Sequence, residues 1–199
     1  KEVVEPSDFE GLPLRAGAAL QTMTLEQLGV NPVTMPAAQA FEALSRGTID
    51  GILLSVADWK SYSFTDLLKY TIDGVALGHW ESYHAISEDA WRRLSEEERE
   101  AFDRLARETA LANAARIEAQ KGEVEEAARK LGAEFLMIGD MSPRMQDHVA
   151  TAARETWAQW IEETEANGHP ARAAARLWAE LIQEEGGVLP EGVEALLQE

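Results

Sequence analysis

Residues 11–54, GLPLRAGAALQTMTLEQLGVNPVTMPAAQAFEALSRGTIDGILL, decide the fold of this chain. The stretch alternates between short apolar segments, which predict strands, and longer segments with apolar side chains at helical spacing. The predicted strands are Leu12–Ala16, Asn31–Met35 and Ile49–Leu54, and the predicted helices are Ala18–Leu28 and the segment between Pro36 and Gly47. This alternation predicts an α/β lobe with a mostly parallel sheet.

Arg15 lies in the first predicted strand and is the strongest candidate for a binding residue. Its guanidinium offers a planar fork of donors that matches a carboxylate, and it stays charged at any working pH. Ligands of open α/β sheets bind beyond the carboxyl ends of the strands, where Ile52–Trp59 would also lie. A lone arginine in a strand is usually solvated or salt-bridged, so a carboxylate clamp at Arg15 depends on the motif around it.

Three phrases carry a resemblance to a known family: GLPLRAG at 11–17, LEQLGVNPVTMPAAQAFEALSRGTIDG at 25–51, and DLLKY at 66–70. Their order and spacing resemble the second lobe of the solute-binding proteins of TRAP (tripartite ATP-independent periplasmic) transporters. The resemblance implies a periplasmic-binding-protein-like lobe with long C-terminal helices, incomplete relative to the two-lobe fold of the family. It also implies a periplasmic protein that captures a small organic acid anion, such as a dicarboxylate, and delivers it to TRAP membrane subunits without a cofactor.

The same resemblance places four residues at the ligand. Arg15 falls on the family's carboxylate-binding arginine. Where the family often has an asparagine or another polar residue, this chain has Leu54 and then Ser55, and Trp59 falls where an aromatic residue often lies near the pocket. Ser55 has an alternative role as the cap of a helix near Val56, and Trp59 has one in closing the core. The apolar Leu54 favours a monocarboxylate or 2-oxo acid over a sugar acid.

Composition excludes several classes of partner and site. The chain of 199 residues has 36 acidic and 18 basic residues, a formal charge of −18, which disfavours nucleic acid and anionic membrane surfaces. It has no cysteine, which excludes disulfides, thiolate nucleophiles and cysteine zinc sites. No apolar run approaches the roughly twenty residues that cross a bilayer, and no signal peptide is visible. We expect no membrane insertion, and a metal only if residues outside this chain supply ligands.

The second half of the sequence predicts mostly helices. Ser95 and Glu98 form a capping-box pattern that predicts a long helix ending at Leu131, with an apolar side that includes Phe102 and Leu105. Trp157 and Trp160 are predicted to be packing anchors against another lobe rather than an aromatic cage. The other predicted elements are a strand-like segment at His79–Ser87, a short helix at Glu88–Leu94, a strand at Ala133–Ile138 that returns to the sheet, a helix from Ser142-Pro143 to Glu165, and a final helix containing Leu177, Trp178 and Leu181.

These patterns divide the chain into four parts: a linker at 1–10, the ligand-binding lobe at 11–75, a crossover strand and long helix at 76–132, and a returning strand with C-terminal helices at 133–199. Complete family members have a further N-terminal lobe, so we expect this chain to be a fragment. A single lobe would expose a sheet edge and an apolar cleft face. We therefore expect it to associate with the missing lobe or with a second copy.

Two other classes of function are alternatives to a binding protein. An enzyme is disfavoured because the histidines are scattered and the sequence has no HExxH, GxSxG, P-loop or GxGxxG pattern. Glu162, Glu163 and His169 do not make a convincing metal site because glycine and proline place that histidine in a turn. The second alternative is an acidic helical interaction module that presents the apolar stripe of its long helix to a partner.

Overall fold

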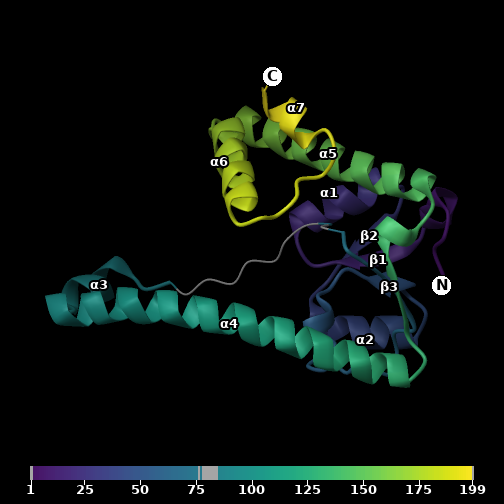
Figure 1. The fold of residues 1–199 in the computed structure, drawn as a ribbon, viewed down its shortest axis with the longest axis horizontal. Coiled ribbons are helices and arrows are strands. Elements are labelled where there is room, and N and C mark those ends of the chain that lie inside the picture. The colour runs from purple at the N-terminus through teal and green to yellow at the C-terminus, as the bar shows by residue number, and fades with distance from the viewer. Residues whose placement is uncertain (1, 76, 78–84, 199) are drawn as a thin grey trace.

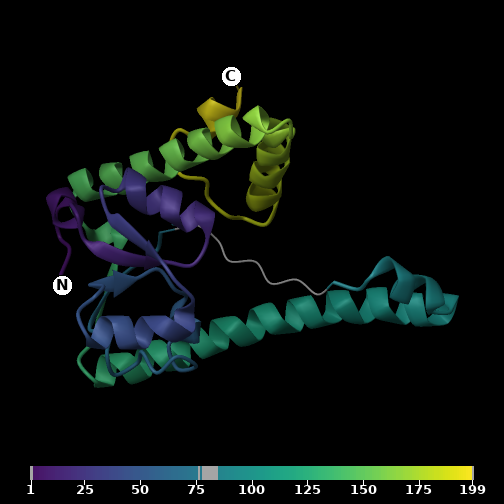
Figure 2. The same cartoon turned by 180° about the vertical axis from the view of Figure 1, so that it is seen from behind.

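The computed structural model describes residues 2–75, 77 and 85–198. It shows an α/β body from which one long helix extends (Figures 1 and 2). The elements are η1 (Pro6–Phe9), β1 (Pro13–Ala16), α1 (Ala19–Gln27), β2 (Asn31–Thr34), α2 (Ala37–Ser45), β3 (Gly51–Ile52), η2 (Val56–Asp58), β4 (Tyr70–Asp73), α3 (Glu88–Arg93), α4 (Glu96–Lys130), β5 (Glu134–Met137), η3 (Ile138–Asp140), α5 (Pro143–Ala166), α6 (Ala171–Glu184) and α7 (Val193–Gln198).

The first three strands form a parallel sheet in the order β2-β1-β3. Arg15 in the middle strand is opposite Val33 of β2 and Ile52 of β3. Helices α1 and α2 are followed by Gly29 and Gly47, whose φ angles of 80° and 68° lie in the left-handed region that glycine adopts without strain. The βαβα alternation predicted for residues 11–54 is thus confirmed.

The sheet is divided, which the sequence did not predict. The strand predicted at Ala133–Ile138 forms as β5, but it pairs in parallel with β4 as a separate two-stranded sheet rather than joining β1–β3. Strand β4 was not predicted as a strand. Most of the predicted strand at His79–Ser87 lies outside the described residues, and its last three residues have no regular structure.

Helices cover both sides of the strands. Helices α1 and α5 lie on one side, and α2 with the C-terminal end of α4 lies on the other (Figures 1 and 2). One apolar cluster lies between the strands and α5, a second lies among α2, β5 and the end of α4, and a third joins α5, α6 and α7. Trp157 and Trp160 pack against this third cluster, so they are packing anchors between helices of this chain, and packing against another lobe stays a prediction.

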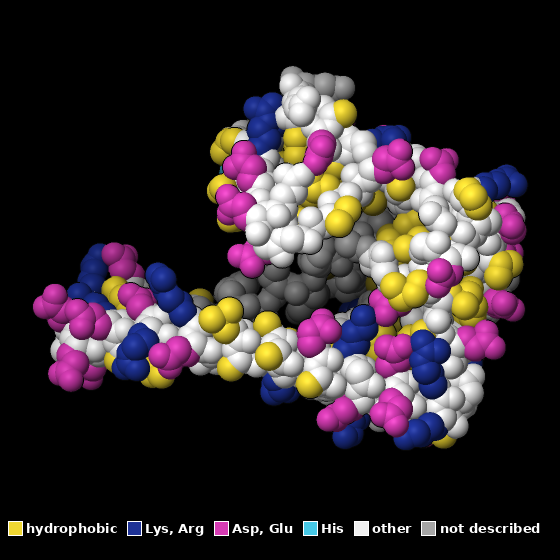
Figure 3. Space-filling view, in the orientation of Figure 1, with side chains coloured by type: hydrophobic (Ala, Val, Ile, Leu, Met, Phe, Trp, Pro, Cys, Tyr) yellow, Lys and Arg dark blue, Asp and Glu magenta, His cyan; other side chains and the backbone are white. Residues whose placement is uncertain are grey.

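Helix α4 begins with the predicted capping box. The Glu98 carboxylate accepts a hydrogen bond from the Ser95 N–H at 2.7 Å, and the Ser95 hydroxyl accepts one from the Glu98 N–H at 3.2 Å. The helix buries only Val124 and Ala128, whereas Leu105 remains 51 % exposed. Figure 3 shows hydrophobic side chains along this projecting helix. Among the described helices, none has both the length and the apolar character of a membrane span.

Candidate functional site

The Arg15 side chain connects the carboxyl ends of three parallel strands. Its Nε donates a hydrogen bond to the Met35 carbonyl at 2.9 Å, and its Nη1 donates one to the Leu53 carbonyl at 3.0 Å. These carbonyls follow β2 and β3 directly, and Arg15 itself lies in β1 between them. The residue is only 5 % exposed, so its orientation is fixed by the fold.

The charge on Arg15 has no acidic partner in the part of the chain that the structure describes. Within the described residues, no aspartate or glutamate forms an ion pair with its guanidinium. Burial lowers the pKa of Arg15 from its ordinary value, and electrostatic interaction with Tyr62 acts in the opposite direction. Burial of a cation without an anionic partner is energetically unfavourable.

Gly17 lies directly against the guanidinium. A Cβ atom at this position would lie 2.3 Å from Nη2 and 2.8 Å from Cζ of Arg15. The Gly17 N–H donates a hydrogen bond to the Gln21 side-chain oxygen at 2.8 Å, which fixes the backbone at the start of α1. Gly17 therefore allows the guanidinium to approach the backbone closely, and no positive φ angle is involved.

We predict that Gly17→Ala displaces the Arg15 guanidinium and breaks its two hydrogen bonds to backbone carbonyls. Each hydrogen bond of a charged group contributes about 1.5–3 kcal/mol, so the free energy of unfolding in urea should fall by roughly that amount or more. Gly122→Ala is a matched control, because Gly122 lies in helix α4 and the added Cβ would meet nothing within 4 Å. Equal free energies of unfolding for the two variants would contradict the close packing of Gly17 against the Arg15 guanidinium.

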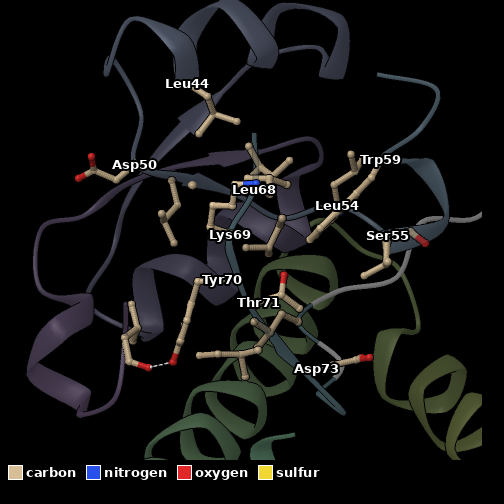
Figure 4. Close-up of a pocket in the computed structure, with 18 of the residues that line it drawn as sticks. Leu44, Asp50, Leu54, Ser55, Trp59, Leu68, Lys69, Tyr70, Thr71 and Asp73 are labelled. Carbon is tan, nitrogen blue, oxygen red and sulfur yellow. Dashed lines mark hydrogen bonds between the residues drawn. The ribbon is translucent and has the colours of Figure 1, made fainter. Parts of the chain in front are cut away.

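A cavity of about 1080 Å³ is lined by residues of β3 and of β4, and Figure 4 shows part of its lining. Leu54, Ser55 and Trp59 contribute to its lining, whereas Arg15 does not. The two regions meet at Leu53, which lines the cavity and accepts the hydrogen bond from Arg15. The structure thus brings three of the four predicted site residues to one cavity and places the fourth next to it.

Ser55 and Trp59 also have structural roles. The Ser55 hydroxyl accepts a hydrogen bond from the Ala57 N–H at 3.3 Å and caps η2, as the alternative interpretation predicted. Trp59 is 2 % exposed and stacks on Phe135, with ring centroids 5.5 Å apart. Leu54 is half-buried and packs against the apolar cluster that contains Trp59 and Phe135. Contact of these three residues with a ligand remains a prediction.

An ion pair at the cavity was not predicted from the sequence. Lys121 of α4 and Asp73 of β4 both line the cavity, and their charged atoms are 3.0 Å apart. Burial alone would raise the pKa of Asp73, but hydrogen bonds from Lys121 and from the Gly74 N–H outweigh it and lower that pKa. The hydrogen bond with Asp73 is the main cause that raises the pKa of Lys121. The pair connects α4 to the second sheet.

Comparison with known proteins identifies the family. Residues 1–164 match the family model for bacterial extracellular solute-binding proteins, family 7. The chain belongs to this family. The chain is 24 % identical over 144 residues to a solute-binding protein of Albidiferax ferrireducens, an alignment that covers 70 % of the chain and 42 % of that protein.

Solved structures of TRAP solute-binding proteins share its fold. One from an unidentified marine microbe, specific for aromatic acid ligands, is 20 % identical with a TM-score of 0.78, and the match covers 92 % of this chain and 58 % of that one. One from Rhodoferax ferrireducens in complex with copurified benzoate is 23 % identical with a TM-score of 0.70, and the match covers 87 % and 54 %.

These matches confirm the resemblance to TRAP solute-binding proteins and the α/β fold class. The chain spans about half the length of the relatives that it matches. The expectation of a binding protein rather than an enzyme agrees with the family assignment. Within the described residues, no group of three or more histidine, aspartate or glutamate side chains is arranged to hold a metal ion.

Proposed function

We propose that this chain is a ligand-binding lobe of an extracytoplasmic TRAP solute-binding protein and that Arg15 binds the carboxylate of a small organic acid. The observation that carries the proposal is the buried guanidinium at the carboxyl ends of three strands, with no acidic partner among the described residues. Two of its nitrogens donate to backbone carbonyls, so the side chain is held in place before a ligand arrives. Such preorganisation lowers the entropic cost of binding.

The residues beside Arg15 favour an acid with an apolar body. Met35, Leu53 and Leu54 lie at the carboxyl ends of β2 and β3. Leu54 is apolar, although related sequences often have a polar residue at this position. Ligands of the structural relatives range from aromatic acids to D-glucuronate, and all of these carry a carboxylate. We infer that this chain takes a monocarboxylate such as an aromatic acid in preference to a hydroxyl-rich sugar acid.

The proposed mechanism is capture and delivery. A second lobe closes over the acid and excludes water, and the attraction between carboxylate and guanidinium strengthens as the local dielectric constant falls. The closed protein then presents the solute to TRAP membrane subunits in the periplasm. The exposed apolar residues of α4, among them Phe102 and Leu105, provide a surface for that second lobe.

A panel of small molecules tests the proposal on the chain itself. NMR titrations that follow the Nε–H signal of Arg15 detect weak binding, and we expect benzoate to shift this signal at lower concentration than succinate or D-glucuronate. Benzamide is the matched control, because it has the same ring without the negative charge. A response to benzamide equal to the response to benzoate, or no response to any acid, would refute the carboxylate site.

A further inference from the structure

Four polar side chains are buried in the part of the chain that the structure describes: Arg15, Gln21, Thr24 and Thr156. The hydroxyl groups of the two threonines donate to backbone carbonyls four residues earlier in their own helices. Each of these bonds uses the single donor that a threonine side chain has. Arg15 and Gln21 differ, because both have side-chain N–H groups that their hydrogen bonds to the described residues do not use.

The side-chain amide of Gln21 has its oxygen occupied and its nitrogen available. Gln21 lies in the first turn of α1 and is 7 % exposed. Its Oε1 accepts the Gly17 N–H at 2.8 Å, and this bond sets the orientation of the amide because only the oxygen can accept. No described residue accepts a hydrogen bond from Nε2. Buried amide nitrogens normally have a partner, so this nitrogen favours a ligand with an acceptor.

Gly17 brings the two available donors close to each other. A Cβ atom at Gly17 would lie 2.3 Å from Nη2 of Arg15, and the Gly17 N–H is the group that Gln21 binds. The Nε and Nη1 atoms of Arg15 donate to backbone carbonyls, whereas Nη2 has no hydrogen-bond partner among the described residues. The guanidinium and the amide therefore contact the same residue and can bind neighbouring groups of one small molecule.

The cavity described above reaches this pair of donors. Gln21 and Leu53 both contribute to its lining, and the Leu53 carbonyl is one of the two acceptors that hold Arg15. The side chains of Leu53 and Leu54 at the end of β3 offer neither a donor nor an acceptor. In this part of the lining Gln21 is thus the polar side chain next to the guanidinium.

We propose that Gln21 determines ligand specificity by donating a hydrogen bond from Nε2 to an oxygen on the carbon next to the carboxylate that Arg15 binds. The inference rests on the proposed carboxylate site at Arg15 and narrows its ligand class to 2-oxo acids. A 2-oxo group supplies an acceptor beside the carboxylate. A 2-hydroxyl group would also require an acceptor for its own hydrogen, which the apolar side chains of Leu53 and Leu54 do not provide.

A matched pair of acids tests this role. Phenylglyoxylate and phenylacetate share the ring and the carboxylate, and only phenylglyoxylate has an oxygen on the carbon between them. NMR titrations of the 199-residue chain give both dissociation constants. We expect phenylglyoxylate to bind about 3- to 10-fold more tightly, because phenylacetate leaves the Gln21 amide without a partner. The side-chain NH₂ signals of Gln21 should also shift further with phenylglyoxylate than with phenylacetate.

Two substitutions separate ligand recognition from the hydrogen bond that Gln21 makes to Gly17. Gln21→Met removes the amide, and Gln21→Glu removes the donor but keeps an oxygen that can accept the Gly17 N–H. We expect both variants to lose the preference for phenylglyoxylate, whereas a purely structural role predicts that Gln21→Glu retains it. Gln27→Met is the control, because Gln27 lies in the same helix, is exposed and bonds to Gln159, and this variant should keep the preference.

The outcomes distinguish this role from the carboxylate site itself. Equal affinities of the unmodified chain for the two acids, with both weakened by Arg15→Lys, would overturn the role of Gln21 and leave the carboxylate site intact. Binding of neither acid would refute both proposals. A preference that survives in Gln21→Met also overturns the role of Gln21. If the variants lose their far-UV circular dichroism, the Gln21 NH₂ signals of the unmodified chain decide, and equal shifts with both acids overturn the proposal.

Discussion

Replacing Arg15 by lysine should weaken binding of benzoate on the order of 10- to 100-fold, because at least one charged hydrogen bond of about 1.5–3 kcal/mol is lost. Lysine keeps the positive charge but presents a point charge in place of the planar fork. It also cannot donate to the Met35 and Leu53 carbonyls and to a carboxylate in the geometry that the guanidinium provides. The measurement is the dissociation constant from an NMR or calorimetric titration.

A second arginine serves as the control for this substitution. Arg46 caps the C-terminal end of α2, is largely exposed and forms an ion pair with Glu42 of that helix. Arg46→Lys therefore makes the same substitution away from the strand ends. Its dissociation constant for benzoate should equal that of the unmodified chain. Circular dichroism of both variants verifies that they remain folded. Equal affinities of Arg15→Lys and Arg46→Lys would show that bidentate geometry at Arg15 has no role in binding.

Local patterns predicted the elements whose ends are set by nearby residues. The strands and helices of residues 11–54 form as predicted because apolar spacing and the glycines at 29 and 47 act within a few residues. The long helix α4 begins at the predicted capping box of Ser95 and Glu98 for the same reason. Helix α5 likewise starts at the predicted pair Ser142-Pro143.

Features that depend on distant residues were not predictable in this way. The choice of β4 as the partner of β5 brings Tyr70 beside Glu134, and no local pattern encodes that pairing. The ion pair of Asp73 with Lys121 has the same origin. The sequence predicted Arg15 as a candidate binding residue. It did not predict the hydrogen bonds of Arg15 to the Met35 and Leu53 carbonyls, because these depend on how the ends of three strands lie together.

Substitutions of Trp59 distinguish a role in the hydrophobic core from a role in ligand binding. It is almost fully buried and stacks on Phe135, so Trp59→Ala should leave a cavity and lower the free energy of unfolding by about 3–5 kcal/mol. Trp59→Phe retains an aromatic ring that can still pack against Phe135 and should cost less. Urea unfolding followed by far-UV circular dichroism measures both values without relying on tryptophan fluorescence.

The control for Trp59 is Trp178 on α6, which is 43 % exposed and lies outside the cluster that contains Trp59. Because surface substitutions usually change stability by about 0.5 kcal/mol or less, Trp178→Ala should have a far smaller effect. A core role also predicts that Trp59→Phe binds benzoate as tightly as the unmodified chain, since a buried indole cannot stack on the ligand. If Trp59→Ala instead unfolds at the normal urea concentration but loses affinity for benzoate, the side chain belongs to the ligand site, and its burial in the free chain must be relieved on binding.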